Sequence, residues 1–133
     1  MVVLLAGAVS HLLLQWQFLS ESWIGPVLGS PLVVIGVLVV FWSTLTIRDM
    51  DISKPTLIIS SGPYAFSRNP MYVAWTAIYL GVAMIMNTVW LIVMLPAVLI
   101  VTHYLVIRRE ERSLEREFGE AYLSYRARVR RYL

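Results

Sequence analysis

Residues 60–72 read Ser-Ser-Gly-Pro-Tyr-Ala-Phe-Ser-Arg-Asn-Pro-Met-Tyr, a polar segment between two long apolar runs. The Gly62-Pro63 pair interrupts regular structure, and Pro70 disfavours a helical Asn69 while suiting the first turn of a helix. We therefore expect a helix to begin near Pro70. A second polar cluster occupies Arg108–Arg112. Because polar chemistry is concentrated in these two clusters, we interpret them as two walls of one site.

The apolar runs predict an all-α integral membrane protein. Of the 133 residues 59% are hydrophobic, and the mean hydropathy is +0.72. Glu21 is the only charge between Met1 and Ile47, and Met71–Ile107 contains none. Each run can cross a bilayer twice at about 20 residues per crossing, with turns at residues 20–26 and 87–88. We therefore expect a single domain, residues 1–133, with four transmembrane helices at Val2–Leu19, Val27–Ile47, Met71–Met86 and Val89–Ile107.

The basic residues predict the orientation in the membrane. All 11 Lys and Arg lie within Arg48–Arg68 or from Arg108 onward. By the positive-inside rule we expect an integral membrane protein, of the cell inner membrane, with both termini cytoplasmic. Anionic lipid headgroups explain this basic face more simply than nucleic acid does, so we expect no nucleic-acid partner. The chain has no cysteine, which excludes disulfides and thiolate-bound metal, and we expect no metal site.

The predicted spans contain small and polar residues that bear on helix packing. Gly29, Gly36 and Ser43 allow close approach of a neighbouring helix. Gly25 and Gly29 also form a G-x-x-x-G pattern, which we interpret as helix-start punctuation because prolines follow closely. In the first span, residues 11 and 15 are His and Gln on one face, for which hydrogen bonding between helices is the expected role.

The fourth span is predicted to continue out of the bilayer to Phe118, with Gly119 as the first stop signal. At α-helical spacing His103 and Glu110 share one stripe of this helix. Beyond Gly119, apolar residues recur at intervals of four and three with arginines between them, which predicts a C-terminal amphipathic helix at the inner membrane interface. The same segment is also able to fold over the site as a lid. Its apolar positions are Leu114, Phe118, Tyr122, Tyr125, Val129 and Tyr132.

These residues alone leave several interpretations open. A Glu110-Glu111 pair flanked by arginines is typical of a solvated, salt-bridged helix face. Tyr64, Arg68 and Tyr72 suit a headgroup-binding loop, and His103 suits a hydrogen bond inside the bundle. No reaction follows from these side chains unaided.

Two separated motifs, taken together, resemble the isoprenylcysteine carboxyl methyltransferase family and its bacterial relatives. The first comprises Gly62-Pro63-Tyr64, Arg68-Asn69-Pro70 and Tyr72, and the second comprises Glu110-Glu111-x-x-Leu114, Phe118-Gly119 and Tyr122-x-x-Tyr125. The resemblance covers most of residues 60–133. One departure is Asn69, which stands where the family has histidine, so that a role needing a titratable imidazole there is not available.

The resemblance implies a helical bundle that is a methyltransferase-like membrane domain. Members of that family and the related phospholipid N-methyltransferases use S-adenosylmethionine to methylate lipophilic acceptors at the cytoplasmic surface. Methyl transfer from a sulfonium requires alignment and a dry pocket more than acid–base groups. The cofactor-binding residues implied are Tyr64, Arg68, Asn69, Pro70, Tyr72, His103, Glu110 and Glu111. No catalytic residue is assigned.

The acceptor and the alternatives stay open at this point. A prenylated cysteine carboxylate, an amine-bearing lipid and an isoprenoid or quinone-like hydroxyl are all compatible with a lipophilic small-molecule or lipid substrate. A different class of function is a non-catalytic membrane module that binds anionic lipid or a partner protein through its basic face. A membrane reductase using a nicotinamide cofactor would need a larger nucleotide site than this chain offers.

Overall fold

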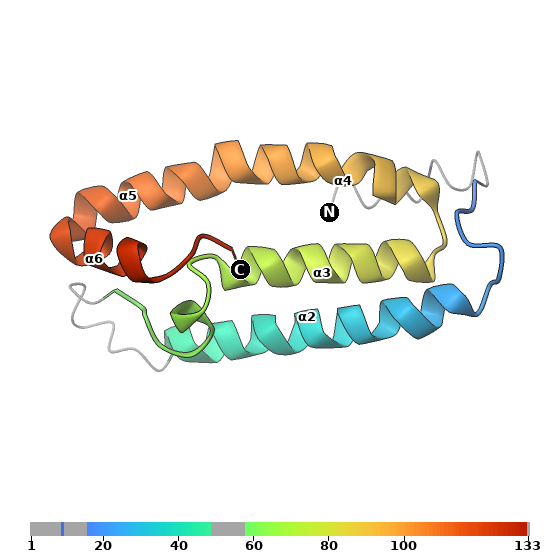
Figure 1. The fold of residues 1–133 in the computed structure, drawn as a ribbon, viewed down its shortest axis with the longest axis horizontal. Helices are drawn as coiled ribbons and strands as arrows, with labels where there is room; N and C mark the ends of the chain where they lie inside the picture. Colours follow the sequence, from blue (N-terminus) through green and yellow to red (C-terminus); the bar gives the residue numbers. More distant parts are fainter. Residues whose placement is uncertain (1–8, 10–15, 49–57, 133) are drawn as a thin grey trace.

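The computed structural model describes residue 9, residues 16–48 and residues 58–132, and in these residues the chain is built from helices (Figure 1). The elements are α2 (Ile24–Arg48), the 3₁₀ helix η1 (Gly62–Ala65), α3 (Pro70–Ile85), α4 (Val89–Val101), the π-helix η2 (Thr102–Ile107), α5 (Arg108–Phe118) and α6 (Glu120–Arg128). Within the described ranges the only strand-like pairing is an isolated bridge between Ser67 and Arg130. The all-α prediction is therefore confirmed for these residues.

Helices α2 and α3 lie side by side along their length (Figure 1), and glycines allow them to approach closely. A Cβ atom on Gly29 would lie 2.5 Å from the carbonyl oxygen of Gly81, and one on Gly36 would lie 2.8 Å from that of Ala74. Backbone therefore touches backbone, as small residues permit between membrane helices. The close approach expected at Gly29 and Gly36 is confirmed. Gly25-Pro26 stands in the first turn of α2, which begins at Ile24, so the interpretation as helix-start punctuation holds there. It is wrong for Gly29, which lies inside α2, and both glycines are buried on this face.

The turn between α3 and α4 falls at Asn87-Thr88, as predicted. Asn87 has a φ of 46°. Its side-chain oxygen accepts hydrogen bonds from the backbone N–H groups of Phe18 and Leu19 at 3.2 and 2.8 Å, and its amide donates to the carbonyl of Leu19 at 2.8 Å. The segment that precedes α2 and the α3–α4 turn therefore lie at the same end of the molecule, opposite η1 and α6 (Figure 1).

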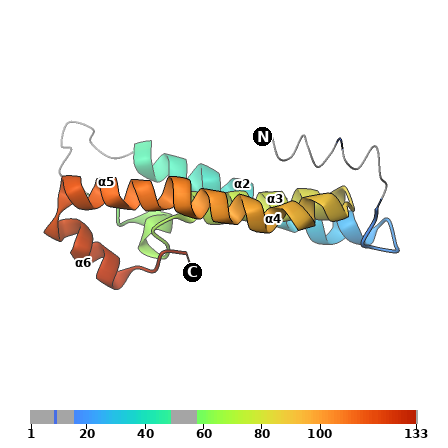
Figure 2. The same cartoon turned by 90° about the horizontal axis from the view of Figure 1, so that it is seen from above.

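The longest helix runs without interruption through α4, η2 and α5. Near its start it packs on α3, where the hydroxyl of Tyr79 donates to the carbonyl of Leu91 at 2.8 Å inside an apolar cluster. It ends at Phe118, and Gly119 follows with a φ of 50°, which a residue with a side chain rarely adopts. The predicted stop at this glycine is confirmed. After it α6 folds back beside the loop that carries η1 (Figures 1 and 2).

Two helices of the described part are long and apolar enough to cross a membrane, Ile24–Arg48 and Val89–Phe118. The apolar part of the second ends at Ile107, since α5 is charged. The expectation of four spans is corrected here, because α3 is confined between Pro70 and the Asn87 turn to 16 residues, or about 24 Å at 1.5 Å per residue. The predicted first span lies outside the described residues, apart from Val9 and the non-helical residues 16–19.

Candidate functional site

The loop before α3 is fixed by short-range hydrogen bonds. The backbone N–H of Tyr64 donates to the carbonyl of Ser61 at 3.1 Å. The N–H of Asn69 donates to the hydroxyl of Ser67 at 3.1 Å. Ser67, Asn69 and Pro70 are buried, and α3 begins at Pro70 as the sequence predicted. These hydrogen bonds fix the conformation of the loop where it leads into α3.

The C-terminal tail, residues 129–132, lies along this loop and is bonded to it. The N–H of Arg68 donates to the carbonyl of Arg130 at 2.9 Å. The carbonyl of Arg131 accepts from the side-chain amide of Asn69 at 3.1 Å and from the hydroxyl of Ser67 at 3.3 Å. The asparagine that stands in place of the family histidine is therefore occupied in holding the tail.

Glu111 is the centre of a buried ion-pair cluster. Its carboxylate lies 3.0 Å from Nη1 of Arg68 and 2.8 Å from Nη2 of Arg131. The side chains of Arg68 and Glu111 are 8% and 11% exposed. Burial by itself would raise the pKa of Glu111, but the hydrogen bonds from Arg131 and the charge of Arg68 outweigh it and hold the pKa below its usual value. Glu111 thus links α5 to both the loop and the tail.

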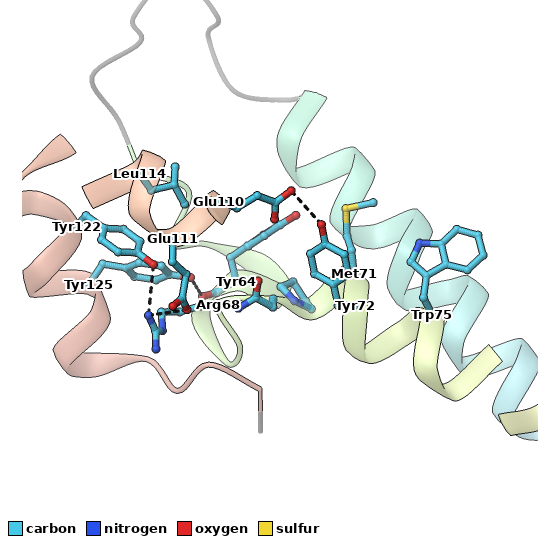
Figure 3. A pocket seen from close by; sticks show the side chains of 12 residues that line it. Tyr64, Arg68, Met71, Tyr72, Trp75, Glu110, Glu111, Leu114, Tyr122 and Tyr125 are labelled. Atoms are coloured by element: carbon cyan, nitrogen blue, oxygen red, sulfur yellow. Dashed lines mark hydrogen bonds and ion pairs between the residues drawn. The ribbon is translucent and has the colours of Figure 1, made fainter. Parts of the chain in front are cut away.

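Glu110, the next residue, has a different neighbour. Its carboxylate accepts a hydrogen bond from the hydroxyl of Tyr72, at the start of α3, at 2.9 Å. It remains exposed to solvent, whereas Glu111 is buried. Figure 3 shows the Glu110–Tyr72 pair and the Glu111–Arg68 pair as two separate links between the same two parts of the chain. The interpretation of both glutamates as a solvated face is therefore wrong for Glu111.

Two tyrosines of α6 form hydrogen bonds with the loop that precedes α3. The hydroxyl of Tyr125 donates to the carbonyl of Tyr64 at 2.7 Å, and the hydroxyl of Tyr122 accepts from Nη1 of Arg68 at 3.3 Å. Burial raises the pKa of Tyr125 to about 12 and raises that of Tyr122 and of Tyr64. These hydroxyls are therefore neutral at physiological pH. The tyrosines expected to face the membrane instead pack on the loop, as the lid alternative expected.

These elements surround one pocket of about 340 Å³ (Figure 3). Arg68 is one of its lining residues, and its Nε atom is buried with no hydrogen-bond partner in the described part of the chain. The residues that line the pocket are Tyr64, Arg68, Asn69, Pro70, Met71, Tyr72, Trp75, Glu110, Glu111, Leu114, Tyr122 and Tyr125.

The structure thus brings together seven of the eight residues implied by the resemblance, and His103 is the exception. Its Nδ1 hydrogen-bonds with the hydroxyl of Tyr132 at 2.5 Å, and it does not line the pocket. The predicted stripe joining His103 to Glu110 assumed α-helical spacing, but His103 belongs to the π-helix Thr102–Ile107, which changes the register.

Several residues at the site were not assigned to it from the sequence. Met71 and Trp75 were read as part of a span, and Arg131 as one of several surface arginines. A signal for the first two exists in principle, since Trp75 lies one turn after Met71 on α3, on the side that Tyr72 adjoins. No local pattern identifies Arg131, whose partners are Glu111 and the distant loop.

The fold and the pocket define a class: a small helical protein with two helices long and apolar enough to cross a membrane and a pocket at the charged end of its longest helix. The family follows from comparison with known proteins. Residues 24–121 match the phospholipid methyltransferase family, and the chain belongs to that family. The family is related to the isoprenylcysteine carboxyl methyltransferases, so the resemblance seen in the sequence is confirmed. Searches among curated proteins and among solved structures gave no match. The family indicates a methyltransferase acting on lipid-type substrates.

Proposed function

We propose that the protein transfers a methyl group from S-adenosylmethionine to a lipophilic acceptor at the cytoplasmic face of the membrane. The observation that carries this proposal is the meeting of two clusters about forty residues apart at one pocket. Tyr72 and Glu110 form one link, at 2.9 Å, and Arg68 and Glu111 form the other, at 3.0 Å. Family membership supports the class of reaction.

The pocket residues suit the groups of S-adenosylmethionine, which carries a sulfonium, a carboxylate, an ammonium, ribose hydroxyls and adenine. Arg68 lines the pocket, and a guanidinium suits a carboxylate oxygen. Glu110 accepts hydrogen bonds from an ammonium or a ribose, and the ring of Tyr64 suits a cation. The volume of about 340 Å³ lies within the roughly 300–1,000 Å³ of small-molecule sites. When bound, the cofactor supplies an electrophilic methyl group.

The implied site residues divide into two roles. Tyr64, Arg68, Tyr72 and Glu110 are proposed to contact ligand. Glu111, Asn69 and Pro70 are proposed to position them: Glu111 holds the guanidinium of Arg68, Asn69 holds the tail, and Pro70 sets the start of α3. No cofactor contact is proposed for His103.

The acceptor favoured by the charges is an amine-bearing lipid. Arg68 is the only cation among the pocket-lining residues, and Glu111 neutralises it. A carboxylate acceptor would therefore lack a cationic partner, and a hydroxyl would make no use of the charge on Glu110. A protonated amine matches the net negative charge of the lining, which has two glutamates and one arginine. The family name, phospholipid methyltransferase, supports the same choice.

The proposed setting is the cell inner membrane with both termini cytoplasmic. In it α2 and α4 with η2 cross the membrane, as the two helices long and apolar enough to do so, and the shorter α3 returns the chain between them. The arginines of α5 and α6 then lie on the cytoplasmic side, where cofactor is available. The two turns near residues 22 and 87 lie at the opposite end (Figure 1).

Cofactor binding separates an enzyme from a non-catalytic membrane module. Calorimetry with S-adenosylhomocysteine on the detergent-purified protein should show binding, and Glu110→Gln should weaken it about ten- to hundredfold, since a charged hydrogen bond contributes about 1.5–3 kcal/mol. Glu115→Gln and Glu117→Gln, on the same helix but outside the pocket, should each lose under about fivefold.

The fourth variant, Glu111→Gln, tests the positioning role. It should weaken cofactor binding because the guanidinium of Arg68 is then no longer held in place by an ion pair. Absence of binding by the unmodified protein would refute the proposal. Equal small losses in all four variants would instead indicate a salt-bridged face and a lipid- or partner-binding module.

A further inference from the structure

A second hollow lies on the neighbouring face of α5 and is lined by charged side chains. Its volume is about 390 Å³. Glu111 is the one residue that it shares with the first pocket. The lining consists of Arg108, Glu111, Arg112, Glu115, Arg126 and Arg131. Residues of α5 thus face residues of α6 and the tail across it.

The charges of this hollow do not cancel. Its lining has four arginines and two glutamates, an excess of two positive charges. Glu115 pairs with Arg126 at 3.5 Å, and Glu111 pairs with Arg131 at 2.8 Å. In the part of the chain that the structure describes, Arg108 and Arg112 have no carboxylate within ion-pair distance. Nε of Arg112 donates to the backbone carbonyl of Arg108 at 3.1 Å, which leaves its Nη groups and the guanidinium of Arg108 without an anionic partner in the described ranges.

The position of the hollow along the helix identifies the kind of anion. Tyr104 and Leu105 are both 53% exposed at the end of the apolar part of the helix. Arg108 follows one turn later, with its guanidinium 5.2 Å from the centre of the Tyr104 ring. Arg112 follows one turn beyond. An aromatic ring followed by arginines is typical of the boundary between acyl chains and lipid phosphates.

We propose that this hollow binds a phosphate group, that of an anionic phospholipid headgroup in the surrounding leaflet. Arginine is suited to phosphate because its planar guanidinium donates two parallel hydrogen bonds. Arg108 and Arg112 supply the guanidinium groups, and Arg131 adds a third donor. Its Nε and Nη2 are bonded to Glu111, while its Nη1 has no partner among the described residues.

A phosphate held in this way joins α5 to the tail. Since the carbonyls of Arg130 and Arg131 are bonded to the loop at Arg68 and Asn69, the phosphate also stabilises one wall of the first pocket. Anionic lipid therefore favours the closed form of the site. Phosphate binding in this hollow requires neither methyl transfer nor cofactor binding.

The test is titration of the detergent-purified protein with short-chain phosphatidylglycerol, short-chain phosphatidylcholine and inorganic phosphate. Phosphatidylglycerol should bind most tightly. The double variant Arg108→Gln/Arg112→Gln should weaken that binding about tenfold or more, because it removes charged hydrogen bonds. The matched control Arg109→Gln/Arg116→Gln removes the same charge from the same helix outside the hollow, and should change the affinity by under about twofold.

A second measurement follows the tail itself. Phosphatidylglycerol should slow hydrogen exchange of the Arg68 amide, which is bonded to the tail, in the unmodified protein but not in Arg108→Gln/Arg112→Gln. Equal losses in the two double variants would mean a diffuse charge effect and would overturn the site. Equal affinity for inorganic phosphate and phosphatidylglycerol would overturn the assignment to a lipid, and unchanged exchange would overturn the coupling.

Discussion

Replacing Glu111 with glutamine should release the C-terminal tail from the loop. The substitution removes the charge that pairs with Arg68 and with Arg131, whose side chains are 8% and 30% exposed. Removing one partner of a buried ion pair costs about 3–5 kcal/mol. Because Arg131 is partly solvated and glutamine keeps an accepting oxygen, we expect about 2–3 kcal/mol against docking of the tail. That corresponds to a roughly 30- to 140-fold larger open population.

Limited trypsin digestion, with mass spectrometry of the product cut after Arg131, measures this population, because the cleavage rate follows the open fraction when opening is fast. The matched control is Glu115→Gln, one turn away. Its partner Arg126 lies at 3.5 Å and both side chains are more than 40% exposed, so the loss should stay below about 1 kcal/mol, or about fivefold. Equal cleavage rates in the two variants would refute the view that Glu111 fastens the tail.

Three further predictions concern pH, packing and orientation. The pKa of Glu111 is lowered from 4.5 in the folded protein. Its contribution to tail docking should therefore be complete above about pH 4.5 and be lost as the pH falls below that value. Hydrogen exchange of the tail should show this loss in the unmodified protein but not in Glu111→Gln. Gly81→Val should lower the unfolding temperature in detergent far more than Ala97→Val at an exposed position, because its Cβ would lie 2.6 Å from the carbonyl oxygen of Gly29. In this cysteine-free chain, an impermeant maleimide should label Ser22→Cys in intact cells but Ser124→Cys only after permeabilisation, and the reverse pattern would overturn the proposed orientation.

Element ends were predictable from the sequence because single residues determine them. Pro70 excludes a helical residue before it and fits the first turn of α3. Gly119 adopts a backbone conformation that other residues avoid, and Asn87 forms the turn between two apolar helices. The meeting of the two polar clusters was also predictable, since each adjoins the same end of a helical hairpin.

The different environments of Glu110 and Glu111 were not predictable. Adjacent residues of an α-helix point about 100° apart, so their surroundings depend on the rotation of the whole helix. That rotation depends on the π-helix, which reads Thr-His-Tyr-Leu-Val-Ile and has no recognised sequence signature. The role of Asn69 was not predictable for another reason. Its side chain donates to a backbone carbonyl 62 residues away, and a backbone carbonyl is present at every position, so no residue type marks the partner.

The π-helix Thr102–Ile107 makes the site depend on the number of residues in the spanning helix. A π-helix contains one residue more than an α-helix of the same rotation, so deleting one residue from it would restore α-helical spacing and leave the residues beyond it facing the same way. Adopting α-helical spacing with every residue kept would instead turn everything beyond it by about 100°. Glu110 would then take the place of Glu111 beside Arg68, and Arg109 would take the place of Glu110 opposite Tyr72. A single-residue deletion should therefore be tolerated better inside this segment than in the α-helical turns before or after it.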